Sequence, residues 1–146
     1  MNQIQNQRAE ARKTVLKKRC NYIINQLLNK IDPSLVNHFK KVDTQPIILL
    51  VKWIRCFFAR EGSIPSVFCL WDYLFSIISD NFKNLDYLCL AVLQYKRQEF
   101  FGCREMSDVM LVLQGITDIE DPYTFIEVSQ RINKIERDVT QNGKSN

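Results

Sequence analysis

The sequence predicts an all-α protein of about seven helices, and three observations carry that prediction. Only four glycines and four prolines interrupt the 146 residues, so helix breakers are few. Apolar residues recur at the three- and four-residue spacing of amphipathic helices along most of the chain. No apolar–polar alternation is strong enough to predict a strand. The length and the composition, 46% hydrophobic and 25% charged, indicate one globular domain.

The first two helices are expected at about 6–30 and 33–41. Apolar residues in the second half of the first helix predict that only this half is buried. Asp32 suits an N-cap and Pro33 the first helical position, so the second helix begins there. We expect residues 1–19 to be a polar, basic segment that is helical or partly disordered.

The third and fourth helices, at about 46–61 and 64–80, are predicted to form a hairpin with a tight turn. Thr44 is expected to cap the third helix, which is apolar on nearly every side and therefore central. Gly62 is expected to end it in the left-handed conformation, and Ser63 to cap the fourth helix.

The remaining helices are predicted from the same spacing and from their caps. They are expected at about 85–101 behind Asn84, at 105–114 ending at Gly115, and at 122–138 behind Asp121. The helical domain would then span residues 20–138, and the polar residues 139–146 would be a disordered tail.

Several classes of protein are excluded by what the sequence lacks. No apolar run is long enough to span a membrane, and residues 1–13 lack the apolar core of a signal peptide, so we expect a cytoplasmic protein. The five cysteines stand singly, and His38 is the only histidine, so neither a metal nor a cofactor is predicted. No phosphate loop, nucleophile elbow or HExxH motif occurs.

The net charge of +4 is concentrated at the N-terminus. Residues 1–30 carry seven Lys or Arg and one acid, a net +6, whereas the rest of the chain carries 13 basic and 15 acidic residues, a net −2. This basic helix is either a solvated face or a contact surface for an acidic protein or an anionic membrane. The candidate contact residues are Arg8, Arg12, Lys13, Lys17, Lys18 and Arg19. Nucleic acid is not expected as a partner, because only Tyr22 lies among these residues.

The stretch LVKWIRCFFAREGSIPSVFCLWDYLF, residues 50–75, places charged and aromatic residues at fixed separations in an apolar hairpin. It resembles the C-terminal half of the TBC domain of Rab GTPase-activating proteins. That family shows a pattern close to L-R-W-x-R-x-x-F-x-R-E-F, followed by a helix ending L-W-D-x-[LI]-F. The matching site residues, which we interpret as mainly structural, are Lys52, Trp53, Arg55, Arg60, Glu61, Trp71 and Asp72.

The resemblance covers about residues 20–135 and implies an orthogonal or antiparallel helical bundle that acts on a Rab in vesicle trafficking. Lys52, Gly62 and Ser63 depart from the family pattern, which usually has arginine, phenylalanine and proline there. For Asp72 we expect Lys52 or Arg55 as the partner across the hairpin. A location in the cytoplasm or on the surface of endomembranes follows from the resemblance.

The family's two catalytic fingers are not found in this sequence. They are the arginine of an I-x-x-D-x-x-R motif and the glutamine of a Y-x-Q motif. No Y-x-Q occurs, and the nearest approach to the first motif, Ile77-x-x-Asp80-x-x-Lys83, ends in lysine. An arginine finger accelerates GTP hydrolysis by about 10³–10⁵-fold. Because this motif is missing, we expect no catalytic residue and no enzyme in this chain. It would support or bind the GTPase; the alternative is a non-catalytic interaction module that binds through its basic first helix.

Overall fold

The structure, a computed structural model, describes residues 2–76, 82–115 and 119–144, and these residues are mainly helical. The helices are α1 (Asn2–Asn21), the π-helix η1 (Tyr22–Leu28), α2 (Asn29–Ile31), α3 (Pro33–Lys41), α4 (Pro46–Cys56), α5 (Ile64–Phe75), α6 (Lys83–Tyr95), α7 (Arg97–Phe101), α8 (Met106–Gln114) and α9 (Pro122–Lys144). The all-α prediction is confirmed.

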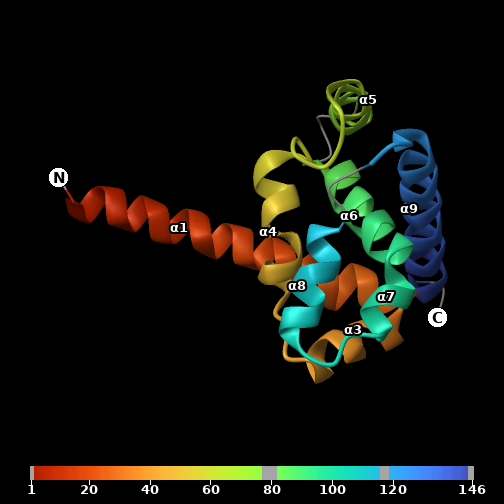
Figure 1. Ribbon diagram of the computed structural model, residues 1–146, viewed down its shortest axis with the longest axis horizontal. Coiled ribbons are helices and arrows are strands. Elements are labelled where there is room, and N and C mark those ends of the chain that lie inside the picture. The colour runs from red at the N-terminus through yellow and green to blue at the C-terminus, as the bar shows by residue number, and fades with distance from the viewer. Residues whose placement is uncertain (1, 77–81, 116–118, 145–146) are drawn as a thin grey trace.

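The first predicted helix is continuous through α1, η1 and α2, and only its second half is buried. Cys20, Ile23 and Leu28 are fully buried, whereas almost all of residues 2–18 are exposed. The N-terminal part of α1 therefore projects away from the body of the molecule (Figure 1). Helical structure in the described part begins at Asn2, four residues before the start that we expected. The spacing of the apolar residues did not predict the π-helix.

The core lies around α6, which is buried at every position from Asn84 to Leu93. The helix α9 lies along α6 and also contacts α5 (Figure 1). The helix α4 packs against α1, and η1 closes the core from the other side. This arrangement buries α6 around its whole circumference, and its buried side chains are apolar except for Asn84 and Asp86.

Three predicted caps are confirmed. Asp32 accepts a hydrogen bond from Leu35 N at 3.3 Å, and Pro33 follows it at the first helical position. Ser63 Oγ accepts from Ser66 N at 3.4 Å, and Asp121 Oδ1 accepts from Thr124 N at 3.4 Å. These caps were predictable because a short polar side chain satisfies amide groups that the helix itself cannot.

Two other predicted caps are wrong. The residue before α4 is Gln45, and Thr44 is buried with its hydroxyl directed to Val42 O. Asn84 lies inside α6, where its Nδ2 donates to Tyr73 O at 3.1 Å. The predicted fifth helix is also divided, because Lys96 leaves helical geometry between α6 and α7.

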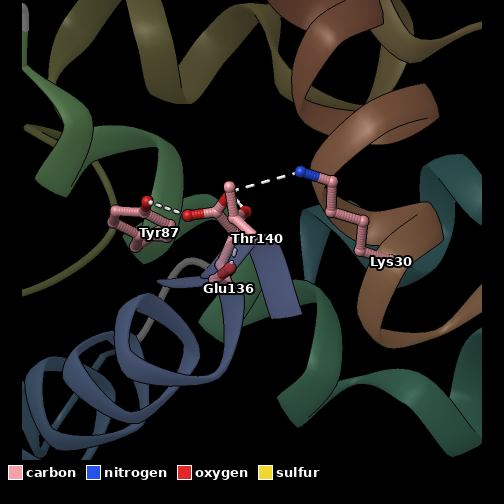
Figure 2. Close-up of polar contacts among 4 residues, drawn as sticks. All are labelled: Lys30, Tyr87, Glu136 and Thr140. Atoms are coloured by element: carbon pink, nitrogen blue, oxygen red, sulfur yellow. Dashed lines mark hydrogen bonds and ion pairs between the residues drawn. The ribbon is translucent and has the colours of Figure 1, made fainter. Parts of the chain in front are cut away.

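The last helix continues beyond the expected end at residue 138 and runs to Lys144, where we had expected a disordered tail. A network around Glu136 lies at this end. Glu136 Oε1 accepts from Lys30 Nζ at 3.3 Å and from Thr140 Oγ1 at 3.1 Å, and Oε2 accepts from Tyr87 at 3.3 Å (Figure 2). This network joins α2, α6 and α9. Burial acts to raise the pKa of Glu136, but the hydrogen bonds and charge of its partners outweigh burial and lower the pKa.

Candidate functional site

The hairpin of α4 and α5 carries the family motif, and Trp53 is its anchor. Trp53 is 1% exposed, and its ring stacks on Phe58 with the centroids 5.3 Å apart and the planes 16° apart. Its position near the C-terminal end of α4 directs the ring into the core shared with α1 and α6. Trp53 is therefore a core residue of the hairpin.

The turn of the hairpin is made by two phenylalanines in the left-handed conformation. Phe57 has a φ of 49° and Phe58 a φ of 60°, so α4 ends at Cys56 rather than near residue 61. This conformation costs about 1–2 kcal/mol for each residue with a β-carbon. Burial of the Phe58 ring, which is 0% exposed, offsets that cost.

Gly62 does not have the left-handed conformation that we expected. Its role is a close approach: a β-carbon at this position would lie 2.9 Å from Ile119 O. The backbone there is held by Ile119 N, which donates to Glu61 O at 2.7 Å, beside an isolated parallel bridge between Gly62 and Ile119. Glycine stands where the family usually has phenylalanine because another segment contacts the backbone at this position.

Trp71 supports the turn from α5. Its Nε1 donates to Phe57 O at 2.8 Å, and this carbonyl belongs to the left-handed turn. The ring is half-buried, with Phe68 on one side and Phe75 on the other at centroid distances of 6.0 and 6.3 Å. The indole therefore links α5 to the end of α4.

Glu61 is the buried charge of the hairpin. It is 1% exposed, and its Oε1 lies 2.9 Å from Lys52 Nζ. Neither carboxylate oxygen has a well-aligned hydrogen-bond donor among the described residues. The pair is therefore held by charge, with Lys52 reaching in from a side chain that is 43% exposed.

Our predicted partners for Asp72 are wrong. Lys52 pairs with Glu61, and both Asp72 and Arg55 are exposed. Arg60 is also exposed. The motif thus divides into interior residues, Trp53 and Glu61, and a charged outer set, Arg55, Arg60 and Asp72, whose side chains make no ion pair in the described part of the chain.

The basic residues of α1 also differ in their exposure and in their partners. Arg8, Arg12, Lys17 and Lys18 are exposed, and Lys13 lies 3.7 Å from the equally exposed Glu10. Arg19 differs: its Nε donates to Asp86 Oδ1 at 2.9 Å and its guanidinium to Phe82 O at 3.0 Å. Arg19 therefore attaches α1 to the start of α6.

Asp86 was missed from the sequence, although a lone carboxylate in the apolar run LDYLCLAVL is a signal for a buried, partnered charge. Burial raises the pKa of Asp86 to about 6, although the charge and hydrogen bond of Arg19 act against the rise.

The raised pKa of Asp86 gives a pH-dependent stability. Its ordinary value is 3.8, so the folded protein binds a proton between pH 4 and 6 that the unfolded chain releases. The stability that Asp86 contributes is present below pH 4 and is lost as the pH rises through about 6, by up to about 3 kcal/mol. Urea unfolding of the wild type and of Asp86→Asn from pH 4 to 7 measures this loss. The wild type should lose stability relative to the variant as the pH rises, and a relative gain would contradict the assignment.

No three His, Cys, Asp or Glu side chains in the described ranges gather as metal ligands do. Cys20, Cys89 and Cys103 are buried and free, and burial raises the pKa of Cys20 to about 11. Ile77 and Asp80, from the nearest approach to the arginine-finger pattern, lie outside the described residues. None of the helices in the described ranges has the length and apolarity that a membrane crossing needs.

Comparison with known proteins identifies the family. The model of the Rab-GTPase-TBC domain matches residues 4–101, which begin within α1 and end with α7. The chain is 33% identical over 117 residues to TBC1 domain family member 5 homolog B of Dictyostelium discoideum, covering 78% of this chain and 11% of the relative. It is 34% identical over 93 residues to TBC1 domain family member 5 of Mus musculus, covering 64% and 11%. TBC1 domain family member 22B of Homo sapiens is 23% identical over 97 residues, covering 66% and 19%. No solved structure matches significantly.

The matched family corrects one expectation. We expected no enzyme in this chain, but the TBC domain is the domain of Rab GTPase-activating proteins, so the expectation is wrong at the level of the family. The chain spans only about a tenth of the length of the first two relatives. The resemblance seen in the hairpin motif is confirmed. The region matched by the family model begins nearer the N-terminus than the expected residue 20, and it ends at residue 101, before the expected residue 135. On these grounds the chain belongs to the Rab-GTPase-TBC domain family.

Proposed function

We propose that this chain takes part in the activation of a Rab GTPase, as the portion of the domain that contacts the GTPase and supports the catalytic residues. Family membership supports the proposal. The observation that carries it is the division of the motif: Trp53 and Glu61 fix the hairpin from inside, while charged residues face outward. A rigid element that presents unpaired charges is suited to contact a partner.

The outward set gives this proposal its contact residues. Arg55 lies in the last turn of α4, Arg60 next to the turn, and Asp72 on α5, all exposed. A guanidinium held at the end of a helix can form paired hydrogen bonds with a carboxylate of the GTPase or with a phosphate of its bound nucleotide. We propose that the arginine and glutamine fingers, whose motifs do not occur in this sequence, come from residues outside it.

Single-turnover GTP hydrolysis across a panel of Rabs tests this function. The chain is assayed alone and together with a segment that carries both finger motifs. We expect one or more Rabs to bind, and hydrolysis to accelerate most when both pieces are present. Absence of binding to every Rab, with no acceleration by the two pieces together, would refute the proposal. Full acceleration by the chain alone would contradict the assignment of the fingers to another segment.

A second proposed role belongs to the projecting helix α1. Its cations Arg8, Arg12, Lys17 and Lys18 are exposed, and the N-terminal part of the helix projects from the body (Figure 1). They can therefore approach an anionic membrane or an acidic protein. This role would place the chain at the cytoplasmic face of an endomembrane. Liposome sedimentation with and without anionic lipid tests it, because binding should require anionic lipid, weaken with salt and vanish when residues 2–18 are deleted. This deletion keeps the contact of Arg19 with Asp86. Binding that is equal with neutral lipid would contradict it.

A further inference from the structure

A hollow of about 480 Å³ lies between the end of α3 and the loop that joins α7 to α8. It is lined by His38, Lys41, Val42, Phe101, Gly102, Cys103 and Arg104. The two sides are far apart in the sequence, so the fold brings them together. Three of the lining side chains are basic, and none is acidic.

One wall of this hollow, formed by His38 and Phe101, is held in place by neighbouring groups. His38 Nε2 lies 3.1 Å from Cys103 O, and its ring lies 5.2 Å from the ring of Phe101. The Phe101 ring also contacts Arg97, whose guanidinium lies 4.6 Å from the ring centroid. Arg97 is fixed in turn by Asp32, at 2.7 Å from its Nε. The wall formed by His38 and Phe101 is therefore built from packed groups.

The acidic side chains on and beside this loop make hydrogen bonds or ion pairs of their own. Glu105, which follows Arg104, accepts from Ser107 Oγ at 2.8 Å. Asp108 Oδ2 accepts from Arg104 N at 2.9 Å and from Glu105 N at 3.3 Å, where it forms part of the cap of α8. Glu99 Oε1 lies 3.2 Å from Lys96 Nζ. Lys41 and Arg104 are exposed, and in the described part of the chain neither side chain makes an ion pair. Two cations at one hollow repel each other unless an anion lies between them.

We propose that this hollow binds a phosphate group. A phosphate carries close to two negative charges and can accept from Lys41 and from the forked guanidinium of Arg104, beside the His38 ring that lines the hollow. The volume is in the range of small-molecule sites, so a phosphate attached to a small organic body fits. The phosphate can be that of a soluble compound or of a lipid headgroup, which share this chemistry. The site lies apart from the α4–α5 hairpin and does not depend on the function proposed for it.

The test uses the whole chain and three probes: inorganic phosphate, soluble inositol trisphosphate, and phosphatidylcholine vesicles with and without phosphatidylinositol bisphosphate. NMR spectra record the amides of residues 102–104 and the His38 ring during titration, with sodium chloride at matched ionic strength as the reference. We expect saturable shifts with phosphate and inositol trisphosphate and none with chloride. Binding to the bisphosphate vesicles that exceeds binding of inositol trisphosphate would indicate a lipid source, and the reverse a soluble one.

The variants are Lys41→Gln with Arg104→Gln as the test and Lys40→Gln as the matched control. Lys40 is also exposed and lies on the same helix but does not line the hollow. The double variant should bind inositol trisphosphate at least about tenfold more weakly, and the control should bind like the wild type. Thermal unfolding verifies that both variants are folded. Shifts that do not saturate, that chloride reproduces, or that persist in the folded double variant would overturn the proposal.

Discussion

Replacing Trp53 by alanine should destabilise the protein by about 3–5 kcal/mol, the range found for large aromatic residues in cores. The ring is 1% exposed and stacks on Phe58, which holds the left-handed turn. Its loss leaves a cavity and also removes the contact that offsets the strain of the turn. This cost is a large fraction of the total stability of a domain of this size, so the variant should be largely unfolded well below the wild-type melting temperature. Urea unfolding followed by circular dichroism measures the change.

Phe68→Ala is the matched control for this experiment. Phe68 is an aromatic residue of the same hairpin, but it is 57% exposed and contacts the ring of Trp71 only from outside. Its replacement should cost less than about 1 kcal/mol. Equal costs for the two variants would contradict the view that the motif tryptophan acts from the interior.

Replacing Lys52 by methionine should cost about 1–3 kcal/mol. The change leaves the Glu61 carboxylate, 1% exposed, without the cation 2.9 Å away. Breaking a fully buried pair costs about 3–5 kcal/mol. We expect the smaller cost of about 1–3 kcal/mol because Lys52 is 43% exposed and water screens the ion pair from that side. Urea unfolding at pH 7 measures the cost.

Two companions of this variant separate charge from packing. Lys52→Arg keeps the cation and introduces the residue usual in the family, so it should match or exceed the wild type, because a guanidinium fork can also reach the oxygens that lack donors. Glu61→Gln combined with Lys52→Met should recover part of the loss, because no buried charge remains. If the double variant is as unstable as the sum of the single changes, the loss does not come from the ion pair.

The elements that sequence reasoning predicted best are those fixed by local chemistry. Asp32 with Pro33, Ser63 and Asp121 each mark a helix start, because a cap depends on residues only a few positions apart. The all-α class followed for the same reason, since helical spacing is a local property. The family resemblance rested on the separations of tryptophan and charged residues within a single hairpin.

The errors concern features that are set by distant contacts. Phe57 and Phe58 adopt positive φ because one ring is buried against Trp53 and the other residue's carbonyl is bound by Trp71, and no local signal marks this turn. Gly62 is required by the approach of Ile119 from another part of the chain. The last helix continues past the expected end beside a network that joins it to Lys30, on a helix more than 100 positions away.

The candidate site was predicted only as a set of residues. Spacing could not distinguish the interior members, Trp53 and Glu61, from the outward Arg55, Arg60 and Asp72, because both kinds occur within the same apolar hairpin. It also grouped Arg19 with the exposed cations of α1, whereas Arg19 binds the buried Asp86. The first distinction is set by the packing of the hairpin, and the second by the packing of α1 against the start of α6.

The central claim is that this hairpin presents charged residues to a Rab. The most direct test is to measure how tightly a double variant, Arg55→Gln with Arg60→Gln, binds Rabs. Each of the Rabs in its GTP-bound state is titrated against the wild type, the double variant and the control Lys40→Gln, with unfolding free energies measured in parallel. We predict at least about tenfold weaker binding by the double variant, with unchanged stability and unchanged binding by the control. Equal binding by the wild type and the double variant, or no Rab bound by the wild type, would contradict the claim.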